Sequence, residues 1–157
     1  MGTGNGSEPA LNCRYAELMA PVAAQPFVAP AIPWLDARPL AALIDLGLGL
    51  DGSALRARLQ GLCKESSVRA VVAFGSRARG EAQPDSDLDL AVICREASLP
   101  PELKTERWQD FRSILGPLGC GVDLVVIGAQ DAERMATSRW HVMGDVAREG
   151  QVLYVAG

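Results

Sequence analysis

Three short apolar runs rich in β-branched residues constrain the fold of this 157-residue chain more than any other feature. They occupy residues 68–74, 87–93 and 120–127, and each has the length and composition of a buried or half-buried β-strand. A fourth short run, QVLYV at 151–155, has the same character. Segments with helical spacing of apolar residues separate the runs. This alternation predicts an α/β or α+β architecture around a small sheet.

The segments between the strands predict helices over residues 53–65, 101–115 and 131–149. Asp51 or Ser53 can cap the first helix, because their side-chain oxygens accept hydrogen bonds from free backbone amides. Two prolines open the second helix, where a missing amide proton costs nothing. We expect the third to be one continuous helix that ends at Gly150 and carries Trp140 on its packing face.

The first 50 residues differ in composition from the rest and contain no chemical motif. We treat residues 1–50 as an irregular, Pro/Ala-rich N-terminal extension and residues 51–157 as the main domain. Within the extension, residues 11–19 are expected to form a short helix and residues 20–33, which carry four prolines, an irregular or extended segment. Residues 39–46 are expected to form one or two helical turns. The apolar content of the extension predicts that it packs on the domain or on a partner.

Composition limits the class of function. Hydrophobic residues make up 48% of the chain, enough for a core, and the net charge is −4. An acidic chain does not attract a phosphate backbone by bulk electrostatics, so no extensive nucleic-acid binding is expected. A single nucleotide can still bind through metal ions, which reverse the local sign of the charge.

Cysteine usage and hydropathy bear on location. The four cysteines form no CxxC pair and there is one histidine, so the sequence predicts reduced thiols and no zinc site. The first residues lack the basic start and apolar stretch of a signal peptide. No segment has 18 uninterrupted apolar residues, so no membrane span is expected. These features favour a cytoplasmic protein.

Two aspartates alternate with leucines at the start of the second strand. Because successive side chains of a strand point to opposite faces, the leucines face the core while Asp87 and Asp89 share the other face. Carboxylates this close repel each other unless a cation lies between them. Oxygen ligands of this kind suit Mg²⁺ or Mn²⁺ rather than zinc.

A third aspartate repeats the arrangement in the next strand. Asp123 points away from the apolar face that its neighbours form, and it joins Asp87 and Asp89 if the two strands are adjacent. Three carboxylates can hold two metal ions about 3.5–4 Å apart, as in enzymes of in-line phosphoryl transfer. The sequence therefore predicts a metal site at these three residues.

The loop over residues 75–86 is a candidate phosphate site. Gly75 allows the backbone to approach a phosphate closely, and the Ser76 hydroxyl can donate a further hydrogen bond. Arg77 and Arg79 are expected to reach phosphate oxygens. One helical turn within this loop would add backbone amides that point at the anion.

The string FGSRARGEAQPDSDLDLAV contains Gly-Ser, ten residues, and then Asp-Leu-Asp. With GVDLVV downstream and the ending AREGQVLY, it resembles the minimal nucleotidyltransferases of the DNA polymerase beta-like nucleotidyltransferase superfamily, over residues 53–155. The resemblance implies a mixed β-sheet flanked by helices. It implies that Gly75 and Ser76 bind phosphates, and that Asp87, Asp89 and Asp123 bind two Mg²⁺ or Mn²⁺ ions.

Minimal nucleotidyltransferases transfer a nucleoside monophosphate from an NTP, usually ATP. Several are antitoxins that adenylylate a tyrosine on a partner HEPN-domain toxin, and the resemblance implies such a partner here. Two alternatives stay open: a non-catalytic module that neutralises a partner by contact, and nucleotidyl transfer to a small molecule. The sequence also leaves homo-oligomerisation open.

Overall fold

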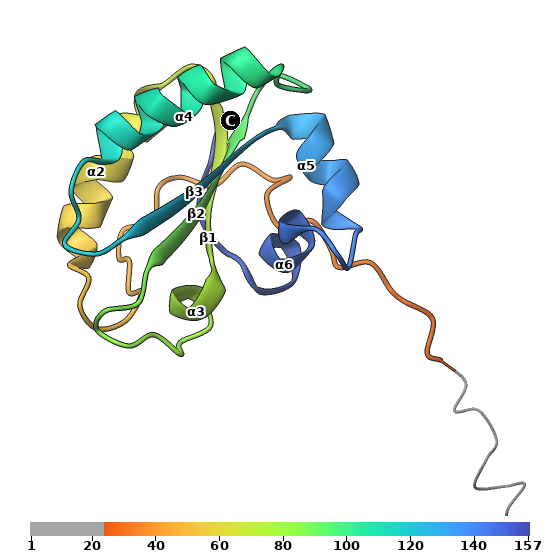
Figure 1. The fold of residues 1–157 in the computed structure, drawn as a ribbon, viewed down its shortest axis with the longest axis horizontal. Coiled ribbons are helices and arrows are strands. Elements are labelled where there is room, and N and C mark those ends of the chain that lie inside the picture. Colours follow the sequence, from red (N-terminus) through yellow and green to blue (C-terminus); the bar gives the residue numbers. More distant parts are fainter. Residues whose placement is uncertain (1–23) are drawn as a thin grey trace, which may run out of the picture.

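A computed structural model describes residues 24–157 as a mixed four-stranded sheet with helices on both faces (Figure 1). The strands are β1 (Val68–Phe74), β2 (Leu88–Cys94), β3 (Val122–Gly128) and β4 (Gln151–Val155). The helices are α2 (Gly52–Lys64), α3 (Gly75–Ala78), α4 (Pro101–Leu115), α5 (Ala129–Ala136) and α6 (Val142–Glu149). This confirms the predicted fold class. Within the described residues no helix has the length and apolarity needed to cross a membrane.

The strand order, β3-β2-β1-β4, places the two aspartate-bearing strands side by side. β1 runs antiparallel to β2 and β4, whereas β2 and β3 are parallel and are connected through α4. Parallel strands begin at the same edge of a sheet, so residues near their starts become neighbours. The register pairs Asp89 directly with Asp123.

Two apolar cores cover the two faces of the sheet. α2 and α4 lie over one face, and α5 and α6 lie over the other (Figure 1). Leu90 of β2 packs in the first core and the next residue, Ala91, packs in the second. By the same alternation Asp89 lies on the α5–α6 side of the sheet. It is the one residue of β2 that is not fully buried.

The strands and the first two helices lie where the sequence predicts them, with ends that shift by one or two residues. Asp51 caps α2 as expected, since its carboxylate accepts hydrogen bonds from the amides of Ser53, at 2.9 Å, and Ala54, at 3.3 Å. The predicted helical turn after β1 is α3. The helix predicted over residues 11–19 lies outside the described residues.

The prediction of helical turns over residues 39–46 is wrong. This segment is irregular because its backbone bonds to the outer edge of β4 instead of to itself. Arg38 exchanges two backbone hydrogen bonds with Val155, at 2.9 and 2.8 Å, and the Ala41 amide donates to Leu153 at 3.0 Å. The segment covers a sheet edge that would otherwise be open, and Trp34 just before it is buried.

The prediction of one helix over residues 131–149 is also wrong, because the chain breaks between α5 and α6. His141 is the N-cap of α6, and its imidazole Nδ1 accepts a hydrogen bond from the Met143 amide at 3.1 Å. At Gly144 a Cβ atom would lie 1.9 Å from the Ser138 carbonyl oxygen, so this tight corner needs glycine. Trp140 lies in the corner and is 90% exposed, not on a packing face.

Candidate active site

The three predicted carboxylates gather at the edge where β2 and β3 begin. Asp87 immediately precedes β2, Asp89 lies within it, and Asp123 of β3 is the register partner of Asp89. Asp87 and Asp123 are exposed, whereas Asp89 is half-buried. The structure therefore brings together on one surface three side chains that the sequence placed in two separate strands.

Two glycines leave the space that these carboxylates occupy. A Cβ atom on Gly75 would lie 2.2 Å from Oδ2 of Asp89, and one on Gly121 would lie 2.3 Å from Oδ1 of Asp87. Gly75 also has a φ of +71°, a conformation that side chains disfavour. The chain turns from β1 into α3 at Gly75, so the phosphate-type loop and the central carboxylate are in direct contact. The sequence predicted a role for Gly75 but gave no signal for Gly121.

The electrostatics of the cluster centre on Asp89. Burial raises the pKa of its carboxyl above the usual range, and the charges of Asp123 and then Asp87 raise it further. The Arg79 guanidinium opposes these effects by lowering the same pKa. The cluster therefore concentrates negative charge at a partly desolvated position.

These residues fit a divalent cation by the chemistry of their donors, which are carboxylate oxygens only. A cation would relieve the repulsion that raises the pKa of Asp89. Within residues 24–157, no three acidic, histidine or cysteine side chains are already drawn together as tightly as a bound ion requires. The Asp87 and Asp123 side chains are exposed and therefore have room to rotate toward Asp89.

The raised pKa of Asp89 predicts a pH-dependent stability of the metal-free protein. The folded state binds the Asp89 proton more tightly than the unfolded chain does, so protonation of Asp89 stabilises the fold. This stabilisation is complete below the pKa of aspartate in the unfolded chain, about 3.9, and is lost as the pH rises through the higher pKa of the folded state. Asparagine does not ionise, so Asp89→Asn does not lose stability in this way as the pH rises. In EDTA, the melting temperature of the variant minus that of wild type should grow as pH rises above about 4. A difference that is constant with pH would contradict the prediction.

Ser76 and Arg79 frame the cluster from α3 and its C-terminal end. Ser76 is half-buried in α3 and directly follows Gly75 in the turn that contacts Asp89. Arg79 is exposed and pairs with Glu81 at 3.0 Å and with Glu149 of α6 at 2.9 Å. Both ion pairs lie at the surface, so Arg79 can exchange them for a phosphate at small cost. No sequence signal pointed to Glu149.

Arg77 does not lie where a phosphate-binding arginine would, and this corrects the sequence prediction. It is 2% exposed, and its guanidinium points into the protein. Nη1 donates to the carbonyls of Leu46, at 2.9 Å, and Leu48, at 2.8 Å, while Nε and Nη2 both donate to the Ser86 carbonyl. With its donors used in this way, Arg77 has none to offer a nucleotide.

Comparisons with known proteins agree with this geometry. The family model "Polymerase beta, Nucleotidyltransferase" matches residues 58–155, a range that includes all three carboxylates and the Gly75–Ser76 turn. The chain therefore belongs to the polymerase beta nucleotidyltransferase family. Within that family it is similar to the protein adenylyltransferase MntA of Thermococcus cleftensis, at 39% identity over 74 residues, which are 47% of this chain and 71% of the relative.

Solved structures show a weaker likeness. A toxin–antitoxin crystal structure with AMP-PNP matches 64% of this chain and 73% of its own, at 22% identity and a TM-score of 0.43. A complex of a tri-AMPylated Shewanella oneidensis HEPN toxin with an MNT antitoxin matches 66% of each chain, at 20% identity and a TM-score of 0.34.

Proposed function

We propose that this protein is a metal-dependent nucleotidyltransferase that transfers AMP from ATP to a hydroxyl group of a partner protein. The observation that carries the proposal is the contact of Gly75 with Asp89, which itself pairs in register with Asp123. That contact joins a phosphate-type turn to a carboxylate cluster. Family membership supports nucleotidyl transfer, and the named activity of the MntA relative supports AMP and a protein acceptor.

In this proposal Asp87, Asp89 and Asp123 hold two Mg²⁺ ions, which would neutralise phosphate charge during an in-line displacement. The backbone at Gly75, the Ser76 hydroxyl and the exposed Arg79 guanidinium bind and orient the phosphates. The acceptor hydroxyl loses its proton to solvent, its oxygen forms a bond to the α-phosphorus, the bond from that phosphorus to the β-phosphate oxygen breaks, and pyrophosphate leaves. By holding the metal ions, the carboxylates would help to position the attacking and leaving oxygens in line, and positioning of this kind supplies much of the rate in phosphoryl transfer.

The acceptor is proposed from the family resemblance. Several minimal nucleotidyltransferases are antitoxins that act on a tyrosine of a HEPN toxin, so we propose a HEPN-domain partner and an antitoxin role. The carboxylates that would attract Mg²⁺ are partly open to solvent, with Asp87 and Asp123 exposed, so a protein-borne hydroxyl can approach them.

The decisive experiment uses the protein with the partner that co-purifies from native lysate. The complex is incubated with Mg²⁺ and ATP labelled at the α-phosphate or, in parallel, at the γ-phosphate. We expect α-label but not γ-label on the partner, release of pyrophosphate, and loss of labelling with Asp123→Asn or EDTA. Mass spectrometry of the labelled peptide then tests for AMP on tyrosine.

Other results of this experiment would support the alternatives. A tight partner that takes no label from any of the four NTPs would indicate a module that neutralises by contact. Label in a small-molecule fraction instead of in protein would indicate a different acceptor class. Label from γ-labelled ATP would contradict nucleotidyl transfer altogether.

A further inference from the structure

A buried arginine outside the carboxylate cluster connects two segments that lie far apart in the sequence. Arg77 has five N–H donors, and every one has a main-chain carbonyl within hydrogen-bond range. Four of these contacts measure 2.8–3.0 Å, and the fifth, from Nη2 to the Pro84 carbonyl, is long at 3.5 Å. A buried charge is costly unless it is bonded in this complete way.

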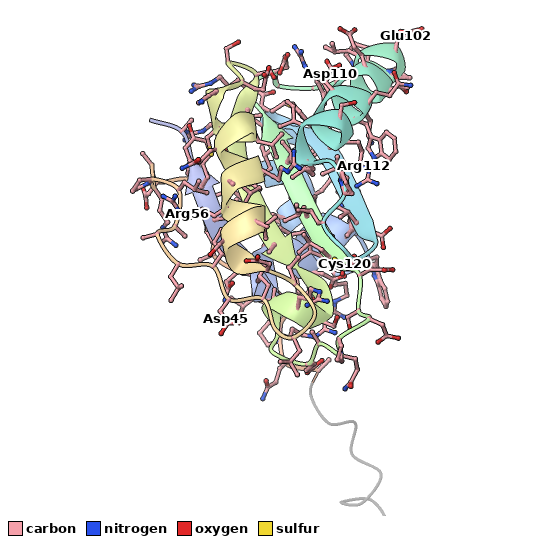
Figure 2. The ribbon with its side chains drawn as sticks, turned by 90° about the vertical axis from the view of Figure 1, so that its left-hand side faces the viewer. Asp45, Arg56, Glu102, Asp110, Arg112 and Cys120 are labelled. Carbon is pink, nitrogen blue, oxygen red and sulfur yellow. The ribbon has the colours of Figure 1, made fainter. Side chains whose placement is uncertain are left out.

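The first segment is the Leu46–Gly49 turn of the N-terminal extension, defined here as residues 46–49. Arg77 holds it through the carbonyls of Leu46 and Leu48. The turn also touches the loop before β2, because a Cβ atom on Gly49 would lie 1.9 Å from the Pro84 carbonyl oxygen. Figure 2 shows Asp45, just before this turn, at the end of α2 near α3.

The second segment is the Pro84–Ser86 loop. The Ser86 carbonyl accepts from both Nε, at 3.0 Å, and Nη2, at 2.8 Å, so its direction is fixed by two bonds. The peptide unit that contains this carbonyl leads directly into Asp87. On the other side of Asp87, the Leu88 amide donates to the Gly121 carbonyl at 2.8 Å. The backbone of Asp87 is therefore held on both sides, once by Arg77 and once by the residue that precedes β3.

From this arrangement we propose that Arg77 is a positioning residue, which fixes the Asp87 backbone by clamping the Pro84–Ser86 loop to the Leu46–Gly49 turn. It makes the N-terminal extension part of the active-site framework although no extension residue needs to touch substrate. Arginine suits this task because its planar fork bonds in several directions at once, which the point charge of lysine does not. The catalytic consequence rests on the proposed function; the clamp itself does not.

Arg77→Met tests the clamp by hydrogen exchange of the full-length protein. The variant leaves the Leu46, Leu48 and Ser86 carbonyls without their charged donor, so exchange of the Gly47, Ser86 and Leu88 amides should accelerate by at least about tenfold. Exchange of the β1 and β4 amides should become faster only by the factor that a loss of global stability accounts for. The matched control is Arg107→Met, which removes a part-buried arginine bonded to Glu96 at 2.7 Å, beyond the far end of β2.

A kinetic measurement separates positioning from nucleotide binding. With a transfer assay in hand, Arg77→Met should lower kcat at least about tenfold and leave KM for ATP within a factor of about three, because Arg77 reaches no ligand. A phosphate-binding arginine would instead raise KM.

The exchange rates of the Gly47, Ser86 and Leu88 amides are corrected in each variant for its change in global stability. The clamp proposal is overturned if these corrected rates are no higher in Arg77→Met than in Arg107→Met. The exchange result decides this even if the wild-type protein transfers no nucleotide, so failure of the proposed function and failure of the clamp are distinguishable.

Discussion

Replacing Asp89 with asparagine is expected to reduce nucleotidyl transfer by at least about a hundredfold, while the metal-free protein stays as stable as wild type or becomes more stable. Charge stabilisation by bound metal is worth several kcal/mol in a transition state, and each 1.4 kcal/mol is tenfold in rate. Stability should hold because burial and the charges of Asp123 and Asp87 already raise the pKa of this carboxyl. The measurements are single-turnover transfer with Mg²⁺ and thermal unfolding in EDTA at neutral pH.

Asp85→Asn is the matched control for this variant. Asp85 is an exposed aspartate in the turn that precedes β2, so the substitution removes one negative charge near the cluster without changing any of its three carboxylates. We expect transfer near the wild-type level. Full transfer activity in Asp89→Asn, or equal losses in both variants, would contradict the metal-ligand assignment.

Gly75→Ala is expected to lower both activity and stability. The new methyl group would lie 2.2 Å from Oδ2 and 3.0 Å from Cγ of Asp89, at a φ of +71°. A side chain in this backbone conformation costs about 1–2 kcal/mol before any clash is counted. Relief of the clash requires the Asp89 carboxylate to move away from Gly75 and so leave its present position in the cluster. Chemical denaturation should therefore show the stability loss, and transfer should fall as it does for Asp89→Asn.

Gly121→Ala isolates the steric part of that effect. Its Cβ atom would lie 2.3 Å from Oδ1 of Asp87, a similar overlap, but Gly121 has no left-handed backbone and Asp87 is an exposed side chain that can swing out. Stability should change by less than about 0.5 kcal/mol. Transfer should still fall, because the Asp87 carboxylate is displaced. A stability loss as large as that of Gly75→Ala would contradict the assignment of strain to Gly75.

The sequence was sufficient for the parts of the site that depend on local periodicity. The alternation of aspartate and leucine in residues 87–90 placed Asp87 and Asp89 on one face, and the Gly-Ser turn lay at a fixed distance before them. That Asp123 joins them follows from the parallel β2–β3 pairing. Sequence patterns indicate strands but not which strands pair, so this step was conditional until the sheet order was known.

The parts that sequence reasoning missed depend on contacts between distant segments. Arg77 resembled an exposed phosphate ligand because arginines are mostly exposed, and its true partners, Leu46 and Leu48, lie in a segment without a motif. Residues 39–46 have helical composition, but the Ala41 amide donates to Leu153 of β4, next to the backbone pairing of Arg38 with Val155. In both cases a tertiary hydrogen bond overrides a local preference.

The pairing of Arg38 with Val155 has a consequence for how the protein is made. Arg38 precedes all four strands and Val155 lies in β4, so a ribosome delivers Arg38 before any strand and Val155 only after β1, β2 and β3. A β-bridge with so large a sequence separation closes late, because a long loop must be ordered before the contact forms. The sheet of β1, β2 and β3 can assemble before Arg38 and Ala41 have their backbone partners on β4. A nascent chain that stops short of β4 therefore has the three carboxylates but not yet the strand that holds Arg38 and Ala41.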